Sequence, residues 1–181
     1  MNISVNKTSI KDVKIIKPEL LEDQRGFFVE IFRKDIYEQY SLPHNFVQMN
    51  HSGSVKGVLR GLHFQWEPPM GKLIWVSKGE GFLVAVDIRL NSPTLGEYVS
   101  ITSNQKNKNM IWAPAGFARG FLALSEWAEL QYLTTGTYNG NAEGNIAWND
   151  NDIKIDWPIE HPIISDRDNK APKFKEWLIS E

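Results

Sequence analysis

The chain has 181 residues, of which 41% are hydrophobic and 23% charged, with a formal net charge of -2 and no cysteine. This length suits one domain, so we expect residues 1–181 to form a single domain. The lack of cysteine excludes disulfides, thiolate metal ligands and a cysteine nucleophile. Because acids and lysines are interspersed along the chain, no broad basic face is expected, and nucleic-acid binding has little support.

The first residues give no sign of a targeting segment. The opening stretch, MNISVNKTSIKDV, is polar and interrupted by charge. No apolar run approaches the length that spans a membrane. The sequence therefore favours a cytoplasmic location.

The first third of the chain is predicted to contain short strands and one short helix. The expected elements, in order, are an edge strand ending at Pro18, a turn at 23–26, a strand over 27–32, a helix over 33–41, and a strand from Phe46 ending in a turn at 52–54. Arginine and glutamate at positions 25 and 30 stand out, although such charges are commonly solvated. Gln48 and Asn50 alternate along the strand from Phe46 and face either solvent or a ligand cavity.

The remainder is also rich in strand patterns, and only its end is convincingly helical. The expected elements are two strands joined by a proline-containing loop over 57–76, a doubly covered strand over 81–90, a strand around 99–102, a hairpin-like connection at 103–109, an apolar region over 110–125 broken by Pro114, Gly116 and Gly120, a strand over 128–138, and a helix over 172–181. Short strands separated by turn residues predict an all-β sandwich or barrel.

The stretch GVLRGLHFQWEPPMGKLIWV, residues 57–76, concentrates residues that can carry chemistry. Arg60 is a permanent cation, His63 can titrate near neutral pH, and Lys72 can stabilise a developing oxyanion. Strand alternation places Arg60 and His63 on opposite faces. Either a bulge near Gly61 brings both to one site, or they serve different parts of one ligand.

Three further predictions each have a structural alternative. Lys72 either enters an apolar cavity or extends to solvent from the start of its strand. Tyr132 has the pattern of a core tyrosine, although a buried hydroxyl needs a partner, which a substrate can supply. The loop SDRD at 165–168 is either a surface turn or the source of Asp168 as the carboxylate that orients His63.

Several other chemistries lack their motifs. None of the four histidines lies in an H-x-H or H-x-x-x-H arrangement, so no metal is expected. The sequence also has no G-x-S-x-G nucleophile elbow, no G-x-G-x-x-G and no P-loop. Acid and base chemistry by ordinary side chains remains.

Taken together, these stretches resemble the dTDP-4-dehydrorhamnose 3,5-epimerase family. The blocks that carry the resemblance span nearly the whole chain in family order: DQRGFFVE, QMNHS, KGVLRGLHFQ, GKLIWVSKGE, VDIRLNSPTLG, PAGFARGF, NIAWND and SDRDNKAP. The resemblance implies a double-stranded β-helix, or jelly roll, of the cupin class with short peripheral helices. It also implies a homodimer that works without a cofactor in the synthesis of surface polysaccharides, such as lipopolysaccharide or capsule.

The resemblance further implies epimerisation at C3 and C5 of a nucleotide-linked 4-keto-6-deoxy sugar, by proton removal and return through an enolate. The implied catalytic residues are His63 as base, Asp168 as its orienting carboxylate, Tyr132 as acid, and Lys72 as the group that stabilises the enolate oxygen. The implied substrate-binding residues are Arg25, Glu30, Gln48, Asn50, Arg60, Tyr138, Glu143 and Arg167, with Tyr138 stacking on the base.

Two motifs depart from the family pattern. Arg119 replaces the histidine of G-F-A-H-G-F, and it can hold an oxyanion, a sugar hydroxyl or a phosphate instead. Thr137 to Gly140 replace the usual tyrosine-tyrosine-x-proline. Alternatives therefore stay open: a GDP-linked 4-keto heptose as substrate, inversion at C3 only, a non-catalytic sugar-binding cupin, or a metal-dependent cupin oxygenase or isomerase.

Overall fold

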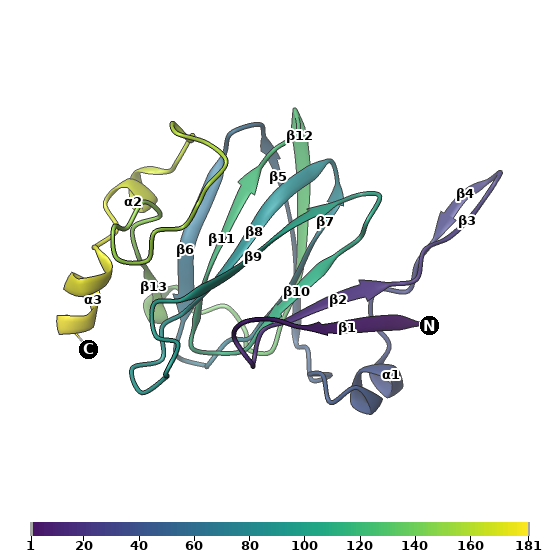
Figure 1. Cartoon of the computed structure of the whole chain (residues 1–181), viewed down its shortest axis with the longest axis horizontal. Helices are drawn as coiled ribbons and strands as arrows, with labels where there is room; N and C mark the ends of the chain where they lie inside the picture. Colours follow the sequence, from purple (N-terminus) through teal and green to yellow (C-terminus); the bar gives the residue numbers. More distant parts are fainter. Residues whose placement is uncertain (1, 181) are drawn as a thin grey trace.

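The computed structural model describes residues 2–180, whose strands form two facing antiparallel sheets and a separate hairpin (Figure 1). The six-stranded sheet has the order β1 (Ile3–Lys7), β2 (Lys14–Pro18), β10 (Met110–Ala113), β7 (Lys72–Lys78), β12 (Trp127–Thr134) and β5 (Gln48–Val55). The five-stranded sheet has the order β13 (Glu143–Asn145), β6 (Leu59–Gln65), β11 (Phe117–Ala123), β8 (Glu80–Asp87) and β9 (Tyr98–Asn104).

The remaining elements are short and peripheral. They are the hairpin of β3 (Leu21–Asp23) and β4 (Gly26–Phe28), the helices α1 (Lys34–Gln39), α2 (Asp166–Asn169) and α3 (Phe174–Ser180), and the 3-10 turn η1 (Gly140–Ala142). No helix within residues 2–180 combines the length and the apolar character needed to cross a membrane.

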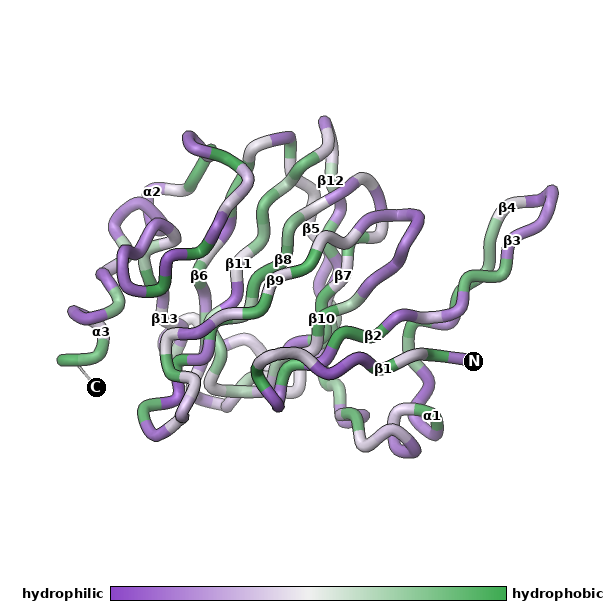
Figure 2. The backbone as a smooth tube through the Cα atoms, in the orientation of Figure 1, coloured by the Kyte–Doolittle hydropathy of each residue, from purple (hydrophilic) through white to green (hydrophobic). Residues whose placement is uncertain are grey.

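The main core fills the space between the two sheets. Ile74, Ile111 and Leu130 from the larger sheet pack against Leu83 and Phe121 from the smaller one. Figure 2 shows hydrophobic residues concentrated along the central strands and polar residues in the connections. Burial of these side chains is the main stabilising term, at roughly 25 cal/mol per Å² of apolar surface. The two sheets therefore hold each other at a fixed separation.

Two smaller cores cover the outer faces of the sheets. Trp157, Phe174 and Trp177 pack on the five-stranded sheet. Tyr37 of α1 is fully buried against the six-stranded sheet, and its hydroxyl donates to the carbonyl oxygen of Ile31 at 2.9 Å. Because the smaller sheet is covered on both faces around β8, this strand is almost continuously apolar. The predicted jelly roll with peripheral helices is the observed architecture.

Several predicted elements are confirmed. The helix predicted over 33–41 is α1, and the C-terminal helix is α3, although Glu181, its predicted last residue, lies outside the described residues. The doubly covered strand over 81–90 is β8, and the strand over 128–138 is β12, which ends at Thr134.

Other boundaries differ from the prediction. The strand ending at Pro18 is not an edge, because β1 precedes it and pairs with its free side. The strand expected over 27–32 ends at Phe28, and Gly120 lies within β11 rather than breaking the apolar region. The hairpin-like connection at 103–109 instead crosses between sheets, since β9 and β10 belong to different ones.

The turn predicted at 52–54 is also wrong, because β5 continues through it to Val55 and pairs with β12 along its whole length. Gly53 is not a turn glycine. A Cβ at Gly53 would lie 2.2 Å from the ring of Trp127, so the glycine makes room for this indole. The serines on either side are consequently strand residues.

Candidate active site

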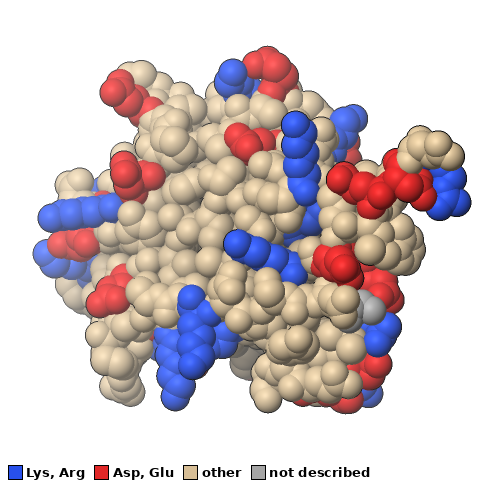
Figure 3. All heavy atoms as spheres, turned by 45° about the vertical axis from the view of Figure 1, so that its right-hand side comes forward, with Lys and Arg blue, Asp and Glu red and all other residues tan. Residues whose placement is uncertain are grey.

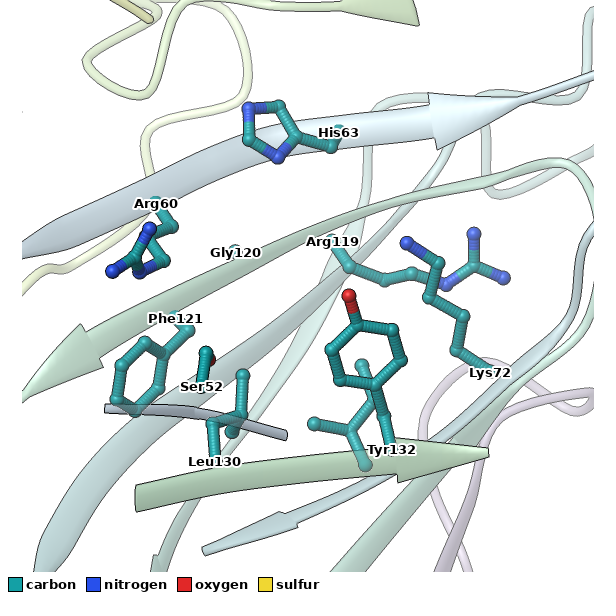
Figure 4. A pocket seen from close by; sticks show the side chains of 10 residues that line it. Ser52, Arg60, His63, Lys72, Arg119, Gly120, Phe121, Leu130 and Tyr132 are labelled. Carbon is teal, nitrogen blue, oxygen red and sulfur yellow. The ribbon is translucent and has the colours of Figure 1, made fainter. Parts of the chain in front are cut away.

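One cavity of about 210 Å³ lies between the two sheets, at one end of the main core. Its walls come from both sheets (Figure 4). The residues that line it are Ser52, Arg60, His63, Lys72, Ile74, Arg119, Gly120, Phe121, Leu130 and Tyr132. Ile74, Phe121 and Leu130 also belong to the main core, so the cavity has an apolar floor below a group of cations, an imidazole and a phenol.

His63 is held by Asp168, which reaches it from α2. Nε2 of His63 lies 2.6 Å from Oδ1 of Asp168, whose side chain is only 3% exposed. Because an ionised carboxylate can only accept, we assign the proton of this bond to Nε2, and Nδ1 is then the acceptor on the cavity side (Figure 4). Burial raises the pKa of Asp168, but hydrogen bonds from His63 and the Gly61 amide outweigh it, and the pKa is lowered.

A bulge in β6 brings Arg60 and His63 to the same cavity. The pairing with β11 shifts register opposite residues 119–121, so β6 has one extra residue between Arg60 and His63. Gly61 lies in this bulge with a φ of +125°, and a Cβ there would lie 2.6 Å from the carbonyl oxygen of Arg119. Only glycine fits this backbone without strain. Of the two alternatives that the sequence left open, the bulge near Gly61 is present in the structure.

Lys72 and Tyr132 enter the cavity from adjacent strands of the larger sheet. Nζ of Lys72 lies 5.2 Å from the centroid of the Tyr132 ring. Burial, followed by the positive charge of Arg119, lowers the pKa of Lys72 to about 8, although the negative charge of Glu143 opposes this. Burial, followed by the negative charge of Glu143, raises the pKa of Tyr132. Lys72 thus points into the cavity rather than extending to solvent.

Arg119 is the most deeply buried cation of the cavity, with 5% of its surface exposed. Burial lowers the pKa of its guanidinium to about 9, which leaves it charged at neutral pH. Its terminal nitrogens donate to four backbone carbonyl oxygens: those of Phe117 at 2.6 Å, Met70 at 2.9 Å, Ala113 at 2.9 Å and Pro114 at 2.5 Å. The hydrogen bonds that the sequence suggested for a ligand are therefore directed at the main chain.

Arg60 is positioned by β5. Its Nε donates to Oγ of Ser54 at 3.1 Å, and one terminal nitrogen donates to the carbonyl oxygen of Gly53 at 3.3 Å. These contacts fix the direction of the guanidinium while leaving other donors for a ligand. Ser54 is 3% exposed and lies in the segment that the sequence suggested as a turn.

Five of the predicted binding residues do not line the cavity but form a hydrogen-bonded chain linked to it, since Asn50 pairs with Tyr132 and the charge of Glu143 acts on Lys72. Gln48 donates to Asn50 at 3.0 Å and accepts from the backbone amide of Tyr138 at 2.9 Å. The Tyr138 hydroxyl donates to Oε2 of Glu143 at 3.1 Å, and Arg167 donates to the same oxygen at 2.5 Å. The Tyr138 side chain is exposed, so its ring has a free face.

Arg25 and Glu30 do not line this cavity. Arg25 stands on the hairpin that projects from the body of the molecule (Figure 1) and is paired with Asp23 at 2.5 Å. On the face seen in Figure 3, basic and acidic residues lie interspersed, including at the tip of the projecting hairpin. Glu30 lies 3.7 Å from Arg33.

The sequence did not single out three serines that support the site. Ser52 lines the cavity, and Ser54 holds Arg60. Ser165 caps α2, its Oγ accepting from the backbone amide of Asp168 at 3.1 Å. Only Ser165 carried a usable signal, since a serine before an acidic first turn is typical of a helix N-cap. Within residues 2–180, no three histidine, aspartate or glutamate side chains are grouped so that they could hold a metal ion.

The fold and cavity define a jelly roll of the cupin class with an imidazole and a phenol on opposite walls of one cavity. The family model described as dTDP-4-dehydrorhamnose 3,5-epimerase matches residues 7–176. The chain belongs to this family. The sequence is 47% identical to dTDP-4-dehydrorhamnose 3,5-epimerase of Shigella flexneri over 174 residues, which cover 95% of this chain and 96% of the relative.

Two other comparisons bear on the substrate and on the reaction. The crystal structure of dTDP-6-deoxy-D-glucose-3,5-epimerase from Legionella pneumophila in complex with dTDP-4-keto-L-rhamnose has a TM-score of 0.93 and 42% identity, and the match covers 96% of this chain and 94% of that one. A more distant relative, dTDP-4-dehydrorhamnose 3-epimerase of Streptomyces niveus, is 36% identical over 90% of this chain and 79% of its own length.

Proposed function

We propose that this protein is an epimerase that inverts C3 and C5 of a dTDP-linked 4-keto-6-deoxy sugar, converting dTDP-4-dehydro-6-deoxyglucose into dTDP-4-dehydrorhamnose. The observation that carries the proposal is that His63 and Tyr132 reach one cavity from opposite sheets. An epimerase needs a base and an acid on opposite faces of the same ring. Family membership supports the choice of substrate.

The first half of the reaction uses His63. The C3 and C5 protons flank the C4 carbonyl, so removing either one gives an enolate. Nδ1 of His63 takes the proton, while Asp168 holds the imidazole in the required tautomer and stabilises the imidazolium that forms. Lys72 lies at the same cavity and supplies the positive charge that stabilises the enolate oxygen.

The second half uses Tyr132, which returns a proton to carbon from the opposite face. Burial keeps this phenol protonated at neutral pH, as a proton donor must be. Return from that face inverts the carbon, and the same cycle at the second carbon completes the 3,5 reaction.

Binding of the nucleotide diphosphate falls to the residues around the cavity. We assign Arg60, held by Ser54, to a phosphate, because a fixed guanidinium can donate two hydrogen bonds to phosphate oxygens. Gln48, Asn50, Glu143 and Arg167 form the surrounding network. The exposed ring of Tyr138 is suited to stacking on the base.

The protein is proposed to act as a homodimer. Arg25 and Glu30 match binding positions of the family but lie away from the cavity of their own chain. The hairpin beside them exposes Leu21, Phe27 and Phe28, at 55%, 58% and 63%. A second copy of the chain is the partner that would cover these side chains and bring the two charges to a ligand.

The cytoplasmic location stays a prediction.

A C3-only epimerase is the second candidate, since the Streptomyces niveus relative is a 3-epimerase. The test is incubation in deuterium oxide with dTDP- and GDP-linked 4-keto sugars, followed by NMR of the C3 and C5 protons. Inversion with deuterium at both carbons of the dTDP sugar is expected. Deuterium at C3 alone supports the second candidate. Activity restricted to a GDP-linked heptose would show that the proposed substrate is wrong. No exchange with any sugar would indicate a non-catalytic sugar-binding protein.

A further inference from the structure

Three cations line the cavity, and two of them, Lys72 and Arg119, come from opposite sheets. Lys72 is the first residue of β7, and Arg119 lies on β11, where it pairs with His63 of β6. Figure 4 shows both side chains at the same end of the cavity. Like charges in a buried site repel, and the repulsion is relieved by an anion or by loss of one proton. The repulsion between Lys72 and Arg119 therefore favours either a negatively charged enolate oxygen beside them or the transfer of a Lys72 proton to that oxygen.

Arg119 lines the cavity, but its guanidinium is not arranged to donate a hydrogen bond to a ligand. Its terminal nitrogens donate to four backbone carbonyl oxygens, which fix the guanidinium and keep it protonated. Its Nε is buried and has no hydrogen-bond partner among the described residues. A donor with no accessible surface cannot reach a substrate in this arrangement. Arg119 thus acts on the cavity through its charge.

Lys72 faces charged and titratable groups from four other strands. They are Arg119 on β11, Arg60 and His63 on β6, Tyr132 on β12 and Glu143 on β13. Neither backbone neighbour of Lys72 carries a charge, because it pairs with Ala113 on β10 and Thr134 on β12. Glu143 is already engaged by Arg167 and Tyr138. Arg119 is therefore the cation whose charge bears most directly on Lys72.

We propose that Arg119 is a positioning residue that makes Lys72 a proton donor to the C4 oxygen of the substrate. This inference rests on the proposed epimerase reaction. As His63 removes the carbon-bound proton, Lys72 gives one of its ammonium protons to the C4 oxygen, so that a neutral enol and a neutral amine form. When Tyr132 protonates carbon, the enol O–H proton returns to Lys72 and the C4 carbonyl is restored.

The decisive measurement is an NMR titration of Lys72 in the free protein, followed at its ¹³Cε and assigned by the signal lost in Lys72→Met. In wild type the midpoint is expected near the value of about 8 set by burial and by Arg119. Arg119→His, which is uncharged at alkaline pH, is expected to raise the midpoint by about one pH unit, whereas Arg119→Lys keeps the charge and the midpoint.

Activity gives the second readout. The alkaline limb of the kcat/KM profile, which reports groups of the free enzyme, should follow the Lys72 midpoint. One unit above the wild-type midpoint, Arg119→His should therefore retain about fivefold more of its maximal kcat/KM than wild type. The inference would be overturned if the Lys72 midpoint did not move in Arg119→His, or if Lys72 of the wild type titrated at the ordinary lysine value of 10.5. If the midpoints shift as expected but no sugar is epimerised, the proposed function fails while the electrostatic coupling stands, so the two failures are distinguishable.

Discussion

Nε2 of His63 lies 2.6 Å from Oδ1 of Asp168, although 105 residues separate the two in the chain. His63 is on a central strand of the smaller sheet, and Asp168 is on the short helix α2, which Ser165 caps. The same carboxylate accepts from the backbone amide of Gly61 at 3.3 Å. Asp168 therefore fixes both the imidazole and the bulge that directs it.

Replacing Asp168 by asparagine should reduce kcat by about 10²- to 10⁴-fold. An asparagine side chain can present its NH₂ group to Nε2, which favours the tautomer with the proton on Nδ1 and removes the base. Asp166→Asn, an exposed change in the same helix, is the matched control and should behave as wild type. Steady-state kinetics on the dTDP sugar provide the measurement. Equal rates for the two variants would count against the orienting role of Asp168.

Gly61→Ala should disrupt the bulge. The backbone at Gly61 has a φ of +125°, and the new Cβ would lie 2.6 Å from the Arg119 carbonyl oxygen. Gly26 has the same φ, but a Cβ added there would have no atom within 4 Å. Gly26→Ala therefore measures the backbone strain alone, about 1–2 kcal/mol, without a steric clash. Urea unfolding should show a larger loss of stability for Gly61→Ala, together with lost activity. Equal losses in both variants would exclude the close contact as a cause.

Ser54→Ala should weaken substrate binding more than turnover. The Ser54 hydroxyl accepts from Nε of Arg60, and without it the guanidinium is free to turn away from a phosphate. A hydrogen bond to a charged group contributes about 1.5–3 kcal/mol, so KM should rise about tenfold or more while kcat changes little. Ser100→Ala, on β9 at the far edge of the sheet, is the control. A fall in kcat at unchanged KM would assign Ser54 a different role.

Asp87 should make the fold sensitive to acid. Its side chain is fully buried and accepts from Arg89, Ser92 and Thr94, and these bonds outweigh burial and lower its pKa far below the ordinary value of 3.8. Because the pKa of Asp87 is lower in the folded than in the unfolded protein, its ionised form stabilises the fold fully above the pKa of the unfolded state. This stabilisation is lost as the pH falls from that value towards the pKa of the folded state. Asp87→Asn should destabilise the protein by about 3 kcal/mol at pH 7 and by less at pH 3. Urea unfolding at both pH values tests this, and a constant difference would contradict it.

The sequence predicted most of the architecture because alternation and turn residues are local signals. It correctly placed α1, β8 and β12, and it anticipated the bulge at Gly61 from the conflict between Arg60 and His63. It failed at Ser52 to Ser54, where three turn-forming residues lie inside β5 because pairing with β12 and the Trp127 ring override local preference. The crossing at 103–109 was missed for a related reason, since strand adjacency in the chain does not determine which sheet a strand joins.

The site was predictable in residue type and less so in geometry. The resemblance named Asp168, but only the fold shows that Ser165 and Gly61 complete its contacts. Arg119 was expected to hold a ligand, and its donors are instead directed at backbone carbonyls that come from distant segments of the chain. Such contacts leave no pattern in the sequence.

The most direct test is deuterium incorporation by His63→Asn and Tyr132→Phe, followed by NMR at C3 and C5 of the dTDP sugar. His63→Asn should neither exchange nor invert either carbon. Tyr132→Phe should still exchange, because His63 can remove a proton and return deuterium to the same face, but it should not invert. Inversion at the wild-type rate in Tyr132→Phe, or undiminished exchange in His63→Asn, would contradict the claim that these two side chains work on opposite faces of one sugar.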